Sequence, residues 1–216
     1  MASPLEQSVM GLVKKVFPEA FEPPIDPSKF GDPLAKQIDW TPAKQGGESF
    51  RTHRLKAIGR ERLEFRGSFY PMLLASCALS IGLGAVGYGG LHREEPGWWK
   101  LMLFGLPFVA AGSVILLSHR RAVFDRECGW FYRGKKPAGP AAPGVLLLAH
   151  IHALQIVGEW CSTGKGGSFR SFELNLVLKD GTRHNVIDHS ALSTIRADAF
   201  RLGEFLRVPV WDATLK

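Results

Sequence analysis

The sequence predicts an α+β protein: an antiparallel pair of apolar helices joined to an antiparallel β domain that a C-terminal amphipathic helix closes. Two observations predict the helix pair, because residues 68–90 carry no charge and residues 98–118 carry only Lys100. A third observation predicts the β domain. Phe172, Leu174, Leu176 and Leu178 alternate with the polar Glu173, Asn175 and Lys179, and the hairpin dipeptide Asp180–Gly181 follows them.

Composition limits the class of protein. The chain has 216 residues, 45% of them hydrophobic, which suits one domain or one domain with a smaller element. Lys and Arg outnumber Asp and Glu by 27 to 20, a formal charge of +7. Cys77, Cys128 and Cys161 form no CxxC pair, which predicts free thiols rather than a disulfide framework.

Residues 1–67 precede the apolar runs and fall into two parts. Residues 1–45 predict an amphipathic segment, around 7–17, followed by a proline-rich linker. The amphipathic segment suits a membrane surface and a protein partner equally. Residues 46–67 predict a β hairpin that turns at Gly59 and Arg60. Such a ribbon is marginal alone, so we expect it to join the later sheet; a loose basic linker is the alternative.

Residues 68–118 predict a transmembrane hairpin with spans at 68–90 and 98–118. About 20 apolar residues cross the hydrocarbon core of a bilayer, and Trp98 and Trp99 suit its interface. The glycines of the first run do not predict a dinucleotide loop, because residues 91–97 open no helix. A buried helix pair in a soluble protein is the competing interpretation.

Small residues predict how the two spans pack. Ser76, Ser80 and Gly84 recur at every fourth position, a spacing that lets helix backbones approach closely in lipid. Gly105 and Gly112 offer a small face on the second span. We therefore expect these five residues to form the helix–helix contact.

Residues 119–216 predict a domain of strands closed by a helix. Strands are expected near 122–126, 129–133, 147–159, 169–179 and 183–188. From Ser190 onward an apolar stripe at helical spacing predicts the closing helix, with Asp188 and Ser190 as its capping residues.

The stretches "FELNLVLKDGTRHNVIDH", "ALSTIRADAFRLGEFLRVPVWD" and "GGESFRTHRL" carry a family resemblance. Over about residues 46–212 the chain resembles uncharacterised bacterial two-span inner-membrane proteins that have a cytoplasmic pleckstrin-homology-like domain. The resemblance implies that fold and the inner (cytoplasmic) membrane as location. It supplies no catalytic residues.

Candidate site residues are few. His150 and His152 share one predicted strand, and His184 and His189 share another, so the four could hold a metal. Nothing in their spacing forces the strands together, and polar surface positions are the alternative, so we predict no metal and no cofactor. Arg120 and Arg121 could hold anionic lipid headgroups where the second span ends.

These features predict a non-enzymatic, membrane-anchored scaffold or adaptor. Its pleckstrin-homology-like domain would bind a protein partner or a lipid headgroup, and the expected partners are membrane lipids with a protein partner or further copies of the chain. A membrane immunity protein against a toxin is the alternative. An enzyme is disfavoured because no nucleophile–base set is present. No nucleic-acid module is recognisable.

Flanking charge predicts the orientation of the spans, with both termini in the cytoplasm. Basic residues concentrate before the first span and after the second, whereas the link between them holds only Arg93. Reporters fused after Lys216 and within residues 91–97 should therefore report opposite sides of the membrane. Reporters on the same side, or release of the chain from membranes by carbonate, would contradict the prediction.

Overall fold

The computed structural model describes residues 25–44, 46–51, 53–67, 69–118, 121–163 and 167–215. The chain forms two compact units. One, the hairpin unit, comprises Thr52–Glu127 and Phe131–Val145; the other, the strap unit, comprises Met1–Arg51, Cys128–Trp130 and Leu146–Lys216. The amphipathic segment expected around residues 7–17 lies outside the described residues, as does Arg120.

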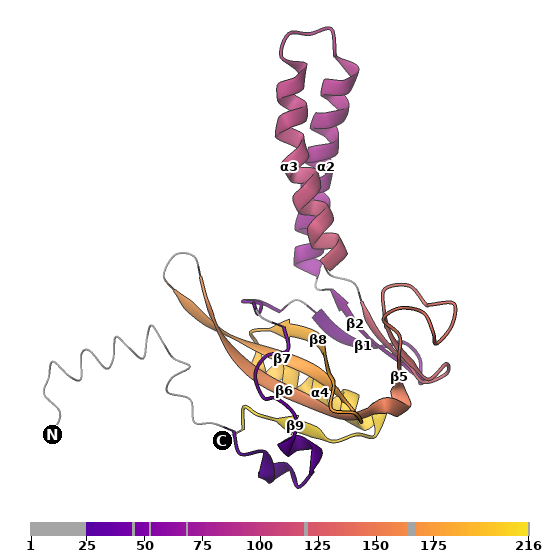
Figure 1. Ribbon diagram of the computed structural model, residues 1–216. Coiled ribbons are helices and arrows are strands. Elements are labelled where there is room, and N and C mark those ends of the chain that lie inside the picture. The colour runs from indigo at the N-terminus through magenta and orange to yellow at the C-terminus, as the bar shows by residue number, and fades with distance from the viewer. Residues whose placement is uncertain are drawn as a thin grey trace, which may run out of the picture. The chain divides into compact units, whose positions relative to one another are not determined.

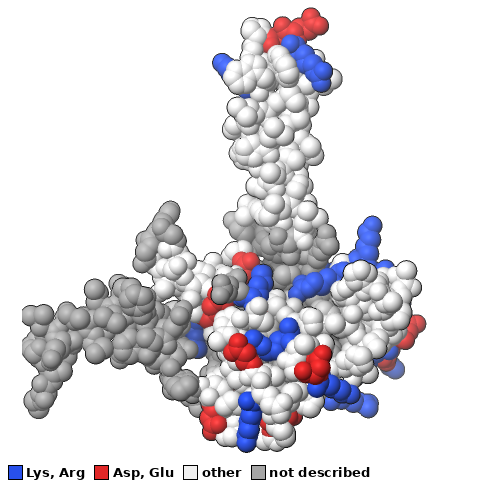
Figure 2. Space-filling model, viewed as in Figure 1, with Lys and Arg blue, Asp and Glu red and all other residues white. Residues whose placement is uncertain are grey.

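Two long apolar helices, α2 (Phe69–Leu91) and α3 (Trp98–Ser118), run side by side as a helix hairpin (Figure 1). Both are long and apolar enough to cross a membrane. Of an apolar 18-residue stretch in each helix, only 17% is buried in α2 and 11% in α3. A buried core pair would need cover on most sides, so this low burial disfavours the soluble alternative. Figure 2 shows a column without charged side chains along its length, with the charges gathered at the link.

Glycines spaced seven residues apart hold α2 against α3. A Cβ added at Gly82 would lie 2.7 Å from the Gly105 carbonyl oxygen, and one added at Gly112 would lie 2.8 Å from the Ala75 carbonyl oxygen. A Cβ at Gly89 would lie 2.8 Å from the Trp98 carbonyl oxygen. The contact therefore repeats with the period of a left-handed antiparallel helix pair.

Two of the five residues expected at the helix–helix contact lie in it. Gly105 and Gly112 lie in the helix contact, but Ser76, Ser80 and Gly84 do not, because all three are exposed and Gly84 has no atom within 4 Å of an added Cβ. The Ser76 hydroxyl instead donates to the Met72 carbonyl one turn earlier, at 2.9 Å. A four-residue spacing suits strongly crossed helices, whereas this hairpin repeats every seven residues.

Strands from both sides of the helix hairpin form one sheet of order β1-β2-β3-β4-β5. Its strands are β1 (His53–Ala57), β2 (Arg62–Gly67), β3 (Ala122–Asp125), β4 (Trp130–Arg133) and β5 (Leu146–Leu147). Antiparallel pairing places Leu63 opposite Phe124 and Phe65 opposite Ala122, so the strand before α2 neighbours the strand after α3. The β1–β2 hairpin thus joins the five-stranded sheet through the pairing of β2 with β3.

The second sheet has the order β8-β7-β6-β9 and lies in the strap unit. It contains β6 (Ile151–Ser162), β7 (Ser168–Leu178), β8 (Arg183–His189) and β9 (Val210–Asp212), with β9 parallel to β6. The strand expected near 147–159 is interrupted by a 3₁₀ turn, η4 (Leu148–His150). Helix α4 (Leu192–Leu206) packs on this sheet through buried Ile195, Ala199 and Leu202.

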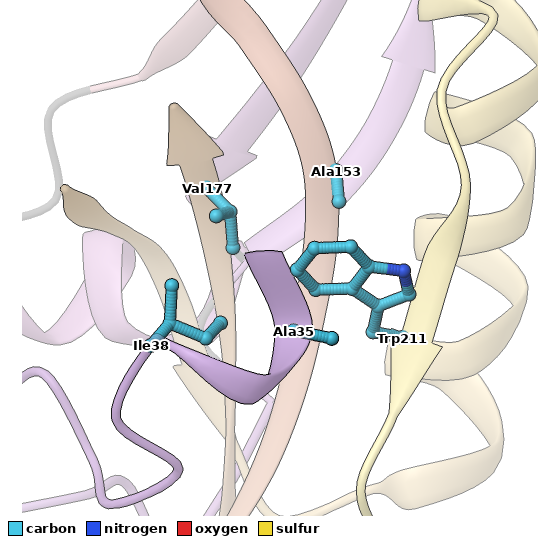
Figure 3. Packing of buried hydrophobic residues seen from close by; sticks show 5 residues of the cluster. All are labelled: Ala35, Ile38, Ala153, Val177 and Trp211. Atoms are coloured by element: carbon cyan, nitrogen blue, oxygen red, sulfur yellow. The ribbon is translucent and has the colours of Figure 1, made fainter. Parts of the chain in front are cut away.

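An N-terminal strap, residues 25–51, packs on the same unit. Its short 3₁₀ helices η2 (Pro27–Phe30) and η3 (Leu34–Lys36) bring Ala35 and Ile38 onto Ala153, Val177 and Trp211 (Figure 3). Phe30 stacks on Trp40 at 5.0 Å between ring centroids, and both rings contact Trp211. The described part of the expected linker, from residue 25 onward, therefore packs in the folded unit.

We expect a Gly82→Ala substitution to destabilise the helix hairpin by about 1–3 kcal/mol, because the new methyl group meets Gly105 and Val109 at 2.7 Å. Gly84→Ala is the matched control, since its methyl group meets nothing and only gains helix propensity. Thermal unfolding in detergent micelles, followed by far-UV circular dichroism, measures both. Equal midpoints for the two variants would argue against the glycine contact.

Candidate functional site: a basic pocket at the base of the helix hairpin

A pocket of about 760 Å³ lies where the helix hairpin meets the five-stranded sheet. All of its walls belong to the hairpin unit. Four of the seven lining residues are cationic, with two glycines and one methionine between them: Arg66, Gly67, Met72, Arg121, Arg133, Gly134 and Lys135.

Three chain segments bring these cations together. Arg66 is the penultimate residue of β2 and Met72 lies in the first turn of α2, while Arg121 immediately precedes β3. Arg133 ends β4, and the following Gly134 donates its N–H to the Arg121 carbonyl at 2.8 Å. Gly134 adopts a φ of 81°, a left-handed conformation that favours glycine. This turn holds the end of β4 beside Arg121.

A buried carboxylate positions two of the pocket arginines. The side chain of Glu64 is only 1% exposed, and its Oε2 lies 2.7 Å from Nε of Arg66 and 3.8 Å from Nη1 of Arg121. Its Oε1 forms an ion pair with Arg62 at 2.8 Å. Residues 62, 64 and 66 share one face of β2, because strand side chains alternate. Glu64 therefore sits among three guanidinium groups and limits where they can lie.

This arrangement suits an anion that has several oxygens. Guanidinium groups pair with phosphate or carboxylate through two parallel N–H donors, and such charge-assisted bonds are the stronger ones. The Arg66 and Arg121 side chains are 43% and 45% exposed, so a ligand can reach the nitrogens that Glu64 does not contact. Met72 adds an apolar surface at the helix end of the pocket.

Of the two arginines proposed from sequence for a lipid headgroup, Arg121 lines this pocket. Arg66, Arg133 and Lys135 were recognised from sequence only as flanking positive charge. Their shared pocket depends on the pairing of β2 with β3, which no local pattern predicts. The alternation of Arg62, Glu64 and Arg66 was the available signal for the ion-pair cluster.

The four histidines proposed for a metal occupy different surroundings. His150 lies in η4, His152 contacts Asp32 of the strap at 2.7 Å, and His184 pairs in register with Leu176. His189 is fully buried, and burial lowers its pKa to about 4. Among the described residues, no group of three or more His, Cys, Asp or Glu side chains gathers as metal ligands do.

The start of α4 differs from the expectation. Its N-cap is Ala191, whose N–H donates to Nδ1 of His189 at 3.1 Å, so neither Asp188 nor Ser190 caps the helix. Asp188 instead faces Lys44 of the strap at 3.5 Å and accepts a hydrogen bond from Asn185. Burial raises the pKa of Asp188.

A second polar cluster binds the strap to the four-stranded sheet. Glu173 accepts the backbone N–H groups of Ala43 and Lys44, and Glu159 accepts those of Gly46 and Gly47. Burial raises the pKa of Glu173. A Cβ at Gly47 would lie within the Ser171 side chain, so only glycine fits there. The chain itself thus covers these carboxylates, which makes the basic pocket the better candidate for a ligand.

We expect a Glu64→Gln substitution to lower the free energy of unfolding of the hairpin unit by about 1–3 kcal/mol, because three arginines lose a buried counter-charge. Glu61→Gln is the control, since Glu61 is exposed in the β1–β2 turn. Chemical unfolding of the full chain in micelles measures both variants. A loss as large for Glu61→Gln would refute the positioning role of Glu64.

Comparison with known proteins leaves the site to be interpreted from its own residues. No protein-family model matches the chain. No curated protein matches its sequence.

Proposed function

We propose that the protein is a membrane-anchored adaptor that binds the headgroup of an anionic phospholipid at the base of its helix hairpin. The single observation that carries the proposal is the basic pocket beside the first turn of α2. Met72 lines that pocket and also begins the first candidate membrane span, Met72–Leu91.

The position of the pocket supports a lipid ligand. If α2 and α3 cross a bilayer, the start of the first span lies at the level of the lipid headgroups. Arginines at that level attract anionic lipid, and Met72 would contact the upper part of an acyl chain. The large apolar side chains exposed on both helices would then face lipid, among them Phe69, Leu83, Tyr88, Leu103, Phe104 and Leu117.

The location, fold and role that we propose rest on features of the sequence. The protein would reside in a bacterial inner membrane with both termini in the cytoplasm. Its antiparallel strands, followed by α4, support a pleckstrin-homology-like fold for the part outside the membrane. The adaptor would have no enzymatic activity. Its strap unit would offer the surface that binds a protein partner.

Lipid retention tests the proposal. The full chain, purified in a nonionic detergent, should retain anionic phospholipid that native mass spectrometry detects. An Arg66→Gln, Arg121→Gln double variant should retain about tenfold less, because two charge-assisted phosphate contacts are lost. Arg60→Gln, at the opposite end of the β1–β2 hairpin, is the control for loss of an exposed arginine outside the pocket and should behave like the unmodified chain.

A second variant separates binding from folding. Arg66 and Arg121 also contact Glu64, so their loss could disturb the sheet, whereas Lys135 lines the pocket as an exposed side chain. A Lys135→Gln variant should therefore reduce retention with an unchanged unfolding midpoint. Full retention by both variants would rule out the pocket as a lipid site.

A further inference from the structure

We infer that the basic pocket selects a phosphate headgroup with two negative charges, such as a phosphomonoester, over a singly charged phosphodiester. The inference rests on the proposed function, because it names the class of ligand at the same site. It is carried by the number of cations that line the pocket, by the burial of Glu64, which contacts two of them, and by the size of the pocket.

The charge of the lining exceeds what a single negative charge would balance. Four cationic side chains line the pocket: Arg66, Arg121, Arg133 and Lys135. Glu64 supplies one negative charge, but its side chain is 1% exposed, and it also pairs with Arg62 outside the lining. The pocket thus keeps a net charge of about three positive units, counting Glu64 entirely toward it. A dianionic group balances more of this charge than a monoanionic one.

Glu64 contributes to this selection by holding the guanidinium groups of Arg66 and Arg121 in place. It contacts Nε of Arg66 and Nη1 of Arg121, and the other nitrogens of both groups stay accessible. Two guanidinium groups anchored on one carboxylate have lost much of their freedom before a ligand arrives, which lowers the entropic cost of binding.

Pocket size agrees with a headgroup larger than a bare phosphate ion. A volume of about 760 Å³ falls among cavities that hold small organic ligands. Arg66 lies near the end of β2, and Arg121 lies just before the neighbouring strand β3. Arg133 is the last residue of β4, and Lys135 lies two residues beyond it. Oxygens of one terminal phosphate can therefore meet cations from more than one strand, which a phosphodiester with two esterified oxygens does less well.

The test compares short-chain lipids on the full chain in nonionic micelles. Dioctanoyl phosphatidate, a phosphomonoester with a charge between about −1.5 and −2 at neutral pH, should bind about tenfold more tightly than dioctanoyl phosphatidylglycerol, a phosphodiester. Isothermal titration calorimetry measures both. The preference should shrink as the pH falls below about 6, where the phosphomonoester loses its second charge.

Variants assign the preference to the pocket. Arg133→Gln, Lys135→Gln should bring the two affinities within about twofold of each other, because the cations that meet the second charge are gone. Arg60→Gln should keep the tenfold ratio. Glycerol 3-phosphate, which has the headgroup chemistry without acyl chains, should bind more weakly than phosphatidate.

Each contrary result has a separate meaning. Equal affinity for the two lipids in the unmodified chain overturns the charge selection and leaves the proposed lipid site standing. Glycerol 3-phosphate binding as tightly as phosphatidate overturns the lipid as the source of the phosphate. No binding of either lipid overturns the proposed function itself.

Discussion

The antiparallel ladder between β2 and β3 is the constraint on which the hairpin unit depends. It joins the strand that leads into α2 to the strand that follows α3, so both ends of the helix hairpin start from neighbouring positions. Neighbouring strands lie about 4.8 Å apart, whereas packed helices ordinarily lie 8–10 Å apart. The glycines at 82, 105 and 112 let the helix backbones approach more closely, which matches the helix pair to the sheet beneath it.

The same ladder explains why a buried acid is tolerated in a basic sheet. In this ladder Glu64 lies opposite Val123, and Phe65 lies opposite Ala122. The next residues along, Arg66 and Arg121, are therefore neighbours. Arginines thus surround the carboxylate on its own strand and on the neighbouring one, and this compensates for its removal from water. One side of the sheet is charged in this way, and the other buries Leu63, Phe65 and Phe124. The basic pocket is the open margin of the charged side.

Local chemistry predicted much of the fold, and non-local pairing decided the rest. The apolar runs gave α2 and α3, and the alternation through 172–178 with Gly181 at a φ of 84° gave β7, its turn and β8. The two separate sheets did not follow from the sequence, because strand propensity says nothing about distant partners. The cap expected at Asp188 failed because burial and contacts with Lys44 and Asn185 draw that side chain to the strap. Of the cations that line the pocket, only Arg121 was proposed from sequence as a headgroup contact, since the other cations come together only after the sheet forms.

The contact between α2 and α3 depends little on the medium around it. Backbone meets backbone at Gly82 and Gly105, so the attraction comes from dispersion between closely packed atoms rather than from the exclusion of water. Such a contact does not require water around it. If α2 and α3 cross a bilayer, as we propose, they can therefore enter it already paired, as one element.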